Sequence, residues 1–455
     1  MPILCSAVLI LYCNIMKKTS KFALAVLAAV VALSSAMGQT SGSNSPFSRY
    51  GWGTLADESM GFNKGMAGLA VAMHDSLSIN RQNPAAYSGI CAQTLIFDAG
   101  ISLQNCQLKS GGKTVNARNS SVDYIAAGFR LAPGVGLSLG LRPFSYVGYN
   151  FSTSKPLDDI DGYGSKTTSS SYYGDGGFRQ AYIGVGYRPV LPLSVGMNIN
   201  YIWGDYQHSS TVSYSDATVQ SLTRNYKATI NAPTVDFGAQ YKYKLDEKNS
   251  FTLGVTYGLG CKINQQAKFV NTQSGTNSSN TPDTMRVGKA FALPDKVAVG
   301  LTWNRGNNLV VGADYSVEFW EKCRFPWLRG SSGLAVYEVG KGHLRNRHKV
   351  TVGAEYVPNP RGYKIKDHIA YRAGMSYSSP YTKTGHGNDG PEYYLVSAGV
   401  ALPIVNKYST RSVLNISAQW EHAASRDLKA LKEDYLRLCI GLTFNATWFN
   451  KWKFE

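Results

Sequence analysis

The chain carries fourteen short segments in which apolar and polar residues alternate, between Leu95 and Phe444. In residues 193–201, for example, every second residue is apolar and the residues between are small or polar. Side chains of a β-strand point alternately to its two faces, so each segment predicts a strand with one apolar and one polar face. The polar set is mainly Gly, Ser, Thr and Asn, which cannot make a packed core. The pattern therefore predicts a barrel whose apolar outer face meets lipid.

The links between the segments alternate in length. The links after even-numbered segments are short or of medium length: 132–134, 189–191, 246–249, 304–307, 359–366 and 403–410. Most links after odd-numbered segments are longer and are predicted to be outer loops: 152–177, 207–224, 271–289 and 321–346. Short periplasmic turns and long outer loops are typical of bacterial outer-membrane barrels. We predict an all-β protein, a 14-stranded antiparallel transmembrane β-barrel in the cell outer membrane of a Gram-negative bacterium.

The N-terminus is predicted to be a leader and signal peptide, residues 1–38. Lys17, Lys18 and Lys21 precede an apolar stretch over 22–33, and 36–38 form a small-x-small cleavage site. The mature chain is then expected to begin at Gln39, and an uncleaved anchor is the alternative. Whether the true start is Met1 or Met16 stays open.

Residues 39–92 show no strand alternation and are too short for a separate domain with its own core. Their aromatic residues, such as Trp52 and Phe62, need burial. A barrel of fourteen strands is wider than its wall side chains can fill. We therefore predict that 39–92 form a plug, or hatch, in the lumen, that the barrel spans 93–447, and that 448–455 are a C-terminal tail. A disordered N-terminal segment is the alternative.

Composition excludes some functions and suggests partners. The net charge is +17, but the positive residues are dispersed, and we expect no nucleic acid. A local cluster at 345–349 suggests lipopolysaccharide and outer-membrane lipid as partners, with solvated loop charge as the alternative. The seven cysteines show no metal-ligand spacing, and a Cys91–Cys106 disulfide stays undecided. We expect no metal and no cofactor.

Two further patterns concern chemistry and the membrane interface. Residues 136–140 match the Gly-x-Ser-x-Gly hydrolase motif, but they alternate as a strand rather than forming the required strand–turn–helix. No catalytic set stands out, so an enzyme is not expected and a lipid-modifying barrel is disfavoured. Aromatic residues near segment ends, such as Tyr124, Tyr149, Tyr187 and Trp320, are predicted to form interfacial girdles.

Charged residues also occupy inward positions of the predicted strands. They are Asp98, Asp236, Asp314, Glu318, Glu355 and Arg372, together with Arg142. Unpaired burial would be costly, so these side chains should pair across the lumen or meet water. An arginine among them could instead bind the carboxylate of a fatty acid. Pro143, within the third segment, predicts a local break, because proline cannot donate to a β-ladder.

The segment before the barrel resembles the hatch of the FadL family of outer-membrane hydrophobic-compound transporters. The resemblance lies in residues 68–87, with Asp75, Ser76 and the run Asn83-Pro84-Ala85, and in residues 140–149 and 176–178, which look like a branch common in Bacteroidetes-type bacteria. One departure is the C-terminus, which runs past the aromatic pair at 448–449 to Glu455.

The resemblance implies a function and a lateral gate. In that family a kink in the third strand opens a hole toward lipid, which Arg142, Pro143 and Phe144 would mark here. The implied function is passive uptake of a hydrophobic small-molecule ligand, such as a long-chain fatty acid, with movement of the hatch. The alternative is a FadL-like barrel that serves as a protein-secretion or surface-attachment partner and works with secretion-machinery proteins.

Overall fold

The computed structural model describes residues 44–156, 166–216, 219–274, 282–306, 308–329, 336–362, 364–384, 389–404, 412–426 and 431–447. The chain divides into two units, residues 1–40 and 41–455, and the following concerns the second. The predicted leader, the start of the predicted hatch and the C-terminal tail lie outside the described residues.

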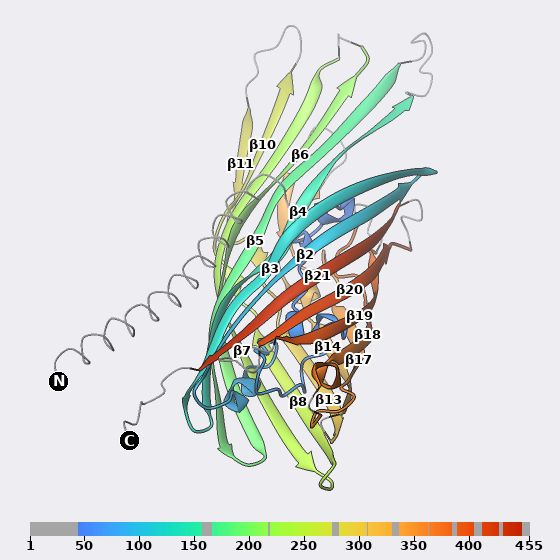
Figure 1. The fold of residues 1–455 in the computed structure, drawn as a ribbon. Coiled ribbons are helices and arrows are strands. Elements are labelled where there is room, and N and C mark those ends of the chain that lie inside the picture. The colour runs from blue at the N-terminus through green and yellow to red at the C-terminus, as the bar shows by residue number, and fades with distance from the viewer. Residues whose placement is uncertain are drawn as a thin grey trace, which may run out of the picture. The chain divides into compact units, whose positions relative to one another are not determined.

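A closed antiparallel sheet of fourteen strands forms the wall (Figure 1). In order around the ring the strands are β2 (Thr94–Ser110), β3 (Lys113–Ala132), β4 (Val135–Pro156), β5 (Thr167–Val190), β6 (Leu193–Tyr214), β7 (Ser221–Lys244), β8 (Asn249–Leu259), β13 (Lys296–Arg305), β14 (Leu309–Glu318), β17 (Arg347–Tyr356), β18 (Ala370–Ser378), β19 (Glu392–Ile404), β20 (Ser412–Ala424) and β21 (Leu431–Thr447). Pairing of β21 with β2 closes the ring. The predicted fold class is confirmed.

Shorter elements complete the fold. β10 (Ala267–Ser274) pairs with the first residues of β7, and β11 (Asp283–Val287) pairs with β10. These two strands continue the sheet on the side of β7 where β8 has ended. The others are η1 (Pro46–Arg49), β1 (Thr54–Leu55), α2 (Gly61–Lys64), η2 (Pro84–Gly89), β9 (Lys262–Ile263), β12 (Phe291–Ala292), η3 (Trp320–Lys322), β15 (Phe325–Arg329), β16 (Val336–Gly340) and η4 (Ile365–His368). Among the described residues, no helix has the length and apolar character needed to cross a membrane.

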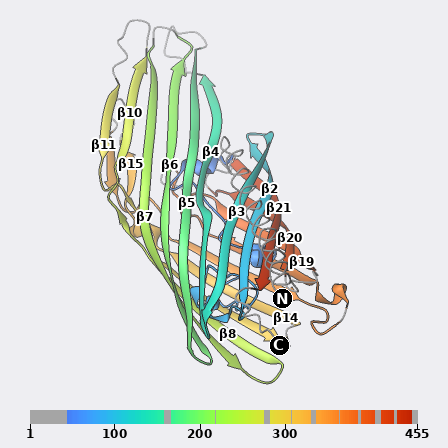
Figure 2. The same ribbon diagram turned by 60° about the vertical axis from the view of Figure 1, so that its left-hand side comes forward.

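The structure agrees with the predicted short turns but not with the predicted long loops. The short links fall between β3 and β4, β5 and β6, β7 and β8, and β13 and β14, as expected. The four predicted outer loops were wrong in extent, however. The β4–β5 ladder continues to the pair Pro156–Thr167 and the β6–β7 ladder to Val212–Leu222. The range 271–289 contains part of the β10–β11 ladder, and 321–346 contains the β15–β16 hairpin. Figure 2 shows β4 to β7, with β10 and β11, extending past the ends of β2, β3 and β21. We call this end, opposite the short turns, the outer end.

The two faces of the wall have the predicted polarity. On β8, Leu253 and Val255 are 47% and 41% exposed, whereas Thr252 and Thr256, which flank this pair, are buried. The apolar face therefore points away from the lumen. The girdle prediction was wrong for part of its residues: Tyr124, Tyr149 and Trp320 are buried, because they point inward against other side chains. Tyr187 is exposed, as expected of a girdle residue.

The disulfide considered from the sequence does not form. Cys106 carries a free thiol and is buried beside Ala423 and Tyr435 in a small cluster near the outer ends of β2 and β21.

Candidate functional site

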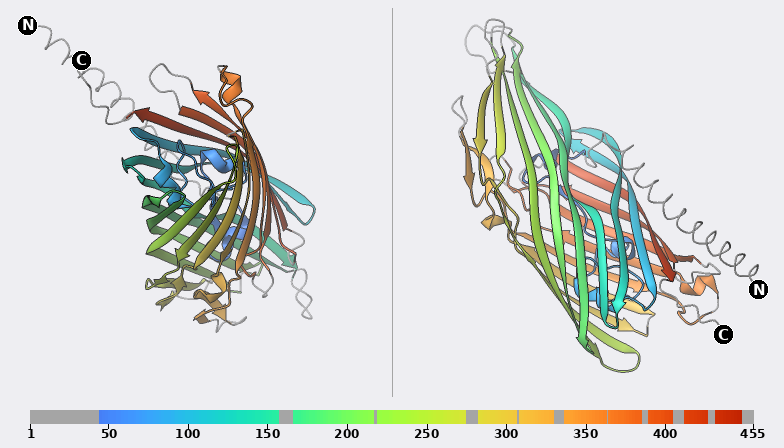
Figure 3. Two further views of the ribbon diagram at one scale, coloured as in Figure 1. Left: turned by 90° about the horizontal axis from the view of Figure 1, so that it is seen from below. Right: turned by 90° about the vertical axis from the view of Figure 1, so that its left-hand side faces the viewer.

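Residues 44–92, which we call the N-terminal segment, run through the ring of strands. Strands on opposite sides of the ring approach its backbone at glycines: a Cβ added at Gly254 of β8 would lie 2.1 Å from Val71 O, and one at Gly441 of β21 would lie 3.0 Å from Gly61 Cα. Figure 3 shows the blue segment between the green and the orange walls. Because these inward-facing glycines have no side chain, they leave room for the backbone of the segment.

The predicted hatch motif lies within this segment at η2. Asn83 is fully buried, and its side-chain amide donates to Val71 O (2.6 Å) and to Ala239 O of β7 (3.2 Å), while its Oδ1 accepts from the Ala85 N–H (3.1 Å). Pro84 follows as the first residue of η2, where its fixed φ suits a helical turn. Asn83 therefore caps η2 and ties the segment both to itself and to the wall.

Asp75 and Ser76 lie in a turn that holds the segment together. Asp75 accepts hydrogen bonds from the Leu77 N–H (3.2 Å) and from Ser78 Oγ (2.5 Å). The Ser76 carbonyl accepts from the Cys91 N–H (3.2 Å). These contacts are local, so the pair serves to shape the turn before the first strand.

The wall is interrupted between β3 and β4. Their ladder ends at the pair Ile125–Leu141, although among the described residues β3 continues outward over 113–124 and β4 over 142–156. A bulge occurs in β4 at the same level, because Pro143 pairs with Arg179 of β5 whereas Ser145 pairs with Phe178. The break that Pro143 predicts is therefore present. We call the unpaired stretch between β3 and β4 the seam.

Residues 44–56 line the seam from the inside. β1 pairs with β4 at Ser145 and Tyr146, and the Ala56 N–H donates to Phe144 O (2.9 Å). Nearer the outer end, Asn44 Nδ2 donates to Asn119 Oδ1 of β3 (3.0 Å). The N-terminal segment thus supplies hydrogen-bond partners to part of the β4 edge, and it also contacts β3.

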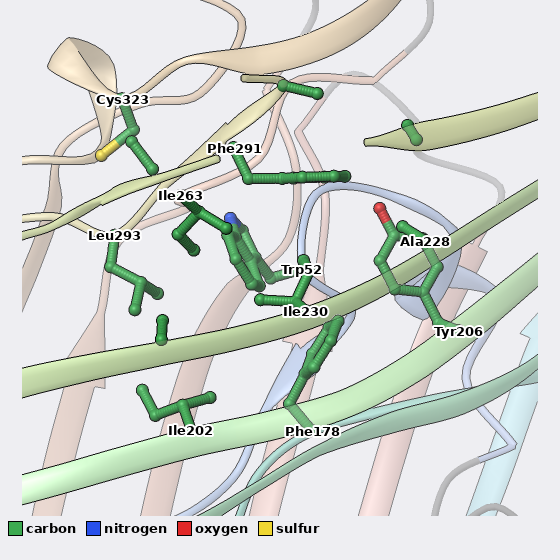
Figure 4. Close-up of a cluster of buried hydrophobic side chains, with 14 of the residues drawn as sticks. Trp52, Phe178, Ile202, Tyr206, Ala228, Ile230, Ile263, Phe291, Leu293 and Cys323 are labelled. Carbon is green, nitrogen blue, oxygen red and sulfur yellow. The ribbon is translucent and has the colours of Figure 1, made fainter. Parts of the chain in front are cut away.

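A buried apolar cluster lies above this contact. Trp52 of the segment is fully buried and meets Phe178 (ring centroids 5.2 Å apart) and Phe291 (5.6 Å) (Figure 4). Phe144, the bulged residue of β4, packs on the same ring (6.2 Å). Residue 144 therefore links the interrupted strand to the segment through both its backbone and its side chain.

Charged side chains surround the segment below the cluster. Glu58 forms ion pairs with Lys296 of β13 (2.5 Å), Arg142 of β4 (3.4 Å) and Arg81 of the segment (3.6 Å). Burial alone would raise the pKa of the Glu58 carboxyl, but Lys296 and Arg142 outweigh it and hold that pKa well below its usual range. Glu58 is therefore a carboxylate that cross-links two strands of the wall to the segment.

A second group of charges lies beside the first. Lys64 of α2 pairs with Asp123 of β3 (3.0 Å) and with Asp57 (3.4 Å). Burial would lower the pKa of Lys64, but the two carboxylates raise it above its ordinary value. The segment is thus held to β3, β4 and β13 by charges of both signs.

Each charged side chain predicted to face the lumen has a hydrogen-bond or ion-pair partner. Asp314 Oδ2 accepts from the backbone N–H groups of Ala70 (2.7 Å) and Val71 (2.9 Å). The remaining contacts are Tyr124 to Asp98 (2.9 Å), Asn200 to Asp236 (2.9 Å), Arg347 to Glu318 (3.5 Å) and Arg372 to Glu355 (2.6 Å). Among the charged residues predicted to face the lumen, Asp314 and Arg142 contact the N-terminal segment directly.

Among the described residues, at least three cavities adjoin the segment. The largest, of about 140 Å³, is lined by polar and charged side chains, among them Asp57, Lys64, Lys349 and Glu421. A second of about 110 Å³ lies between Arg142, Asp236 and Trp320, and a third of about 10 Å³ lies beside Ile125 and Leu141 at the foot of the seam. The interior is therefore polar below the cluster around Trp52.

Sequence reasoning missed Glu58, Arg81 and Lys296. The first two precede the strands, where no alternation marks which residues face inward. Lys296 is the first residue of β13 and was not among the inward charges predicted from the sequence. The signal available was the presence of opposite charges in a short segment otherwise rich in Gly, Ala and aromatic residues.

The solved structures with a similar fold include two toluene transporters and a FadL homologue. The Ralstonia pickettii toluene transporter TbuX is 14% identical, covers 85% of this chain and 98% of its own, and has a TM-score of 0.56. For the Pseudomonas putida toluene transporter TodX the values are 14%, 87%, 100% and 0.55, and for a Pseudomonas aeruginosa FadL homologue 13%, 87%, 99% and 0.57. At these identities the likeness establishes the fold alone.

No curated protein matches the chain in sequence. The sequence profile of the BamG family matches residues 16–455, nearly the whole chain. The chain belongs to the BamG family.

Proposed function

We propose that this protein is an outer-membrane transporter that admits small hydrophobic or amphiphilic molecules, such as long-chain fatty acids, by passive diffusion. The ligand would enter at the outer end, and movement of the N-terminal segment, the hatch, would let it leave through the seam into the membrane. Arg142, Pro143 and Phe144 would form the lateral gate. We further infer a signal peptide, a Bacteroidetes-type relationship, and lipopolysaccharide as the neighbour of the outer rim.

The observation that carries the proposal is the seam. Unpaired strand edges are costly in lipid, because no water is present to satisfy the backbone. Here the β4 edge lies beside a bulge and is covered in part by residues 44–56. A wall that is open at one place, with a covering element on its inner side, suits passage between lumen and membrane better than a sealed pore.

Two measurements test the proposal. Replacing Pro143 with valine should restore ladder pairing and reduce fatty-acid uptake by a deletion strain that carries the variant. Full uptake would rule out the gate. A variant lacking residues 39–86 should still insert and should conduct ions in planar bilayers, and unchanged conductance would contradict the hatch.

A second candidate is a role as a partner in protein secretion or surface attachment. The sizes of the cavities favour it, because about 140 Å³ is well below the ~300 Å³ expected of a small-molecule site. Normal fatty-acid and aromatic-compound uptake in the deletion strain, together with lost surface proteins, would support this candidate and refute transport.

A further inference from the structure

One carboxylate borders all three internal cavities. Glu58 lines the cavities of about 140, 110 and 10 Å³, and among the described residues lining them it alone is common to all three. The smallest cavity lies at the foot of the seam, beside Ile125 and Leu141. Any group that moves from the lumen to the seam by way of these cavities therefore passes Glu58.

The two arginines beside Glu58 are more deeply buried than Glu58 itself. The side chains of Arg81 and Arg142 are 6% and 5% exposed, whereas those of Glu58 and Lys296 are 28% and 31% exposed. Removing one partner of a buried ion pair leaves a charge uncompensated, which is strongly unfavourable. Arg81 also pairs with Asp236 (3.8 Å) and Lys296 with Glu318 (3.8 Å). Arg142 is therefore the cation that needs an anion at this position whenever the segment moves.

We propose that Glu58 occupies the place of a ligand's carboxylate. An anionic amphiphile would exchange its head group for Glu58 on Arg142, Arg81 and Lys296. The exchange would release residues 52–58 from β4 and leave the charge of the site unchanged. This inference rests on the proposed transport function and narrows its substrate class to amphiphiles with a carboxylate head. A neutral hydrocarbon has no group that could replace Glu58.

The position of Arg142 couples the exchange to the wall. Arg142 directly precedes Pro143, and two residues before Glu58 the Ala56 N–H donates to Phe144 O at the bulge. Guanidinium groups suit carboxylates because their N–H donors form a planar fork. Displacement of Glu58 would therefore loosen the covering element at the place where the seam begins.

The test measures binding of dodecanoate and of dodecanol, which have the same chain length, to the full-length protein in neutral detergent by titration calorimetry. We expect the wild type to bind dodecanoate at least about tenfold more tightly than dodecanol, the weight of one charge-assisted contact. Glu58→Gln removes the internal competitor and should tighten dodecanoate binding by a further tenfold or so, without changing dodecanol binding. Equal affinities for acid and alcohol, or the same dodecanoate affinity in both proteins, would overturn the inference.

Asp434→Asn is the matched control. Asp434 pairs with Lys109 (3.0 Å) and His422 (2.6 Å) on the outer part of β21 and borders none of the three cavities, so its loss should leave both affinities unchanged. Heat-modifiable mobility on gels verifies that each barrel is folded. Lys296→Gln provides a second test in case Glu58→Gln does not fold, because loss of this cation should weaken dodecanoate binding about tenfold. Unchanged binding in Lys296→Gln would contradict the site.

The two proposals fail differently. If dodecanoate binds as expected but the deletion strain takes up fatty acids normally, the carboxylate site stands and the transport role falls. If uptake depends on the protein but acid and alcohol bind equally, transport stands and the role of Glu58 falls.

Discussion

The inward glycines offer a direct test of where the N-terminal segment lies. At Gly254, the Cβ of an alanine would lie 2.1 Å from Val71 O, 2.6 Å from Val71 C and 2.9 Å from Ala72 Cα. All three are backbone atoms, so no change of side-chain rotamer can relieve the overlap. The segment would have to move by about 1 Å to restore ordinary contact in a close-packed interior.

The expected cost of Gly254→Ala follows from this overlap. Extra atoms forced into a well-packed interior cost about 1–3 kcal/mol, and rigid backbone on both sides places this site at the upper end. We expect urea unfolding of the protein in lipid vesicles to show a loss of about 2–3 kcal/mol. Gly288→Ala is the control, because the nearest heavy atom, Gln266 Cγ, lies 3.9 Å away, and its effect should stay within about 0.5 kcal/mol.

A cycle with the deletion variant makes the test specific. When residues 39–86 are absent, Gly254→Ala has nothing to collide with, and its cost should disappear. A second substitution, Gly196→Ala, would meet Pro84 C at 2.4 Å and should be less than additive with the first, because both displace the same segment. An unchanged unfolding midpoint in Gly254→Ala, or an equal cost with and without the segment, would refute the placement.

Three further predictions concern the contacts of the segment. Asn83→Ala removes three hydrogen bonds, two donated to the carbonyls of Val71 and Ala239 and one accepted from the Ala85 N–H, and should lower the free energy of unfolding by about 2 kcal/mol or more, measured in urea. Asp314→Ala leaves the N–H groups of residues 70 and 71 unpaired and should raise ion conductance in planar bilayers, whereas Asp314→Asn, which keeps an acceptor, should not. Burial, together with the Arg188 cation 3.1 Å away, lowers the pKa of His74 below its ordinary 6.5. The unfolded chain therefore binds this proton first, so stability should be constant above about pH 6.5 and fall below it, and His74→Gln should flatten that part of the unfolding profile.

Much of the barrel could be predicted from the sequence because lipid and lumen impose a period of two on every strand. The short links, the strand order and the break at Pro143 all followed from alternation and from the missing N–H of proline. The outer extents of β4 to β7 were not predicted, because the Ser- and Thr-rich stretches there have two polar faces and resemble loops.

The segment inside the barrel was harder to read. Its charges have no periodicity, and the partners of Glu58 come from residue 81, β4 and β13, which lie far apart along the chain. The wall carried a usable signal, however, because Gly254, Gly300 and Gly374 recur at inward positions of strands. Their spacing marks where another backbone approaches.

The direction of the N-terminal segment constrains assembly. Ser45 donates to Glu433 only two residues from the outer end of the β2–β21 ladder, whereas residue 92 precedes β2 at the opposite end. The polypeptide therefore traverses the interior before β2, the first strand of the wall, begins. The strands β2 and β21 can pair only after the wall has wrapped around this segment. Biogenesis must accordingly enclose this stretch during closure, since threading it afterwards would require the ring to reopen.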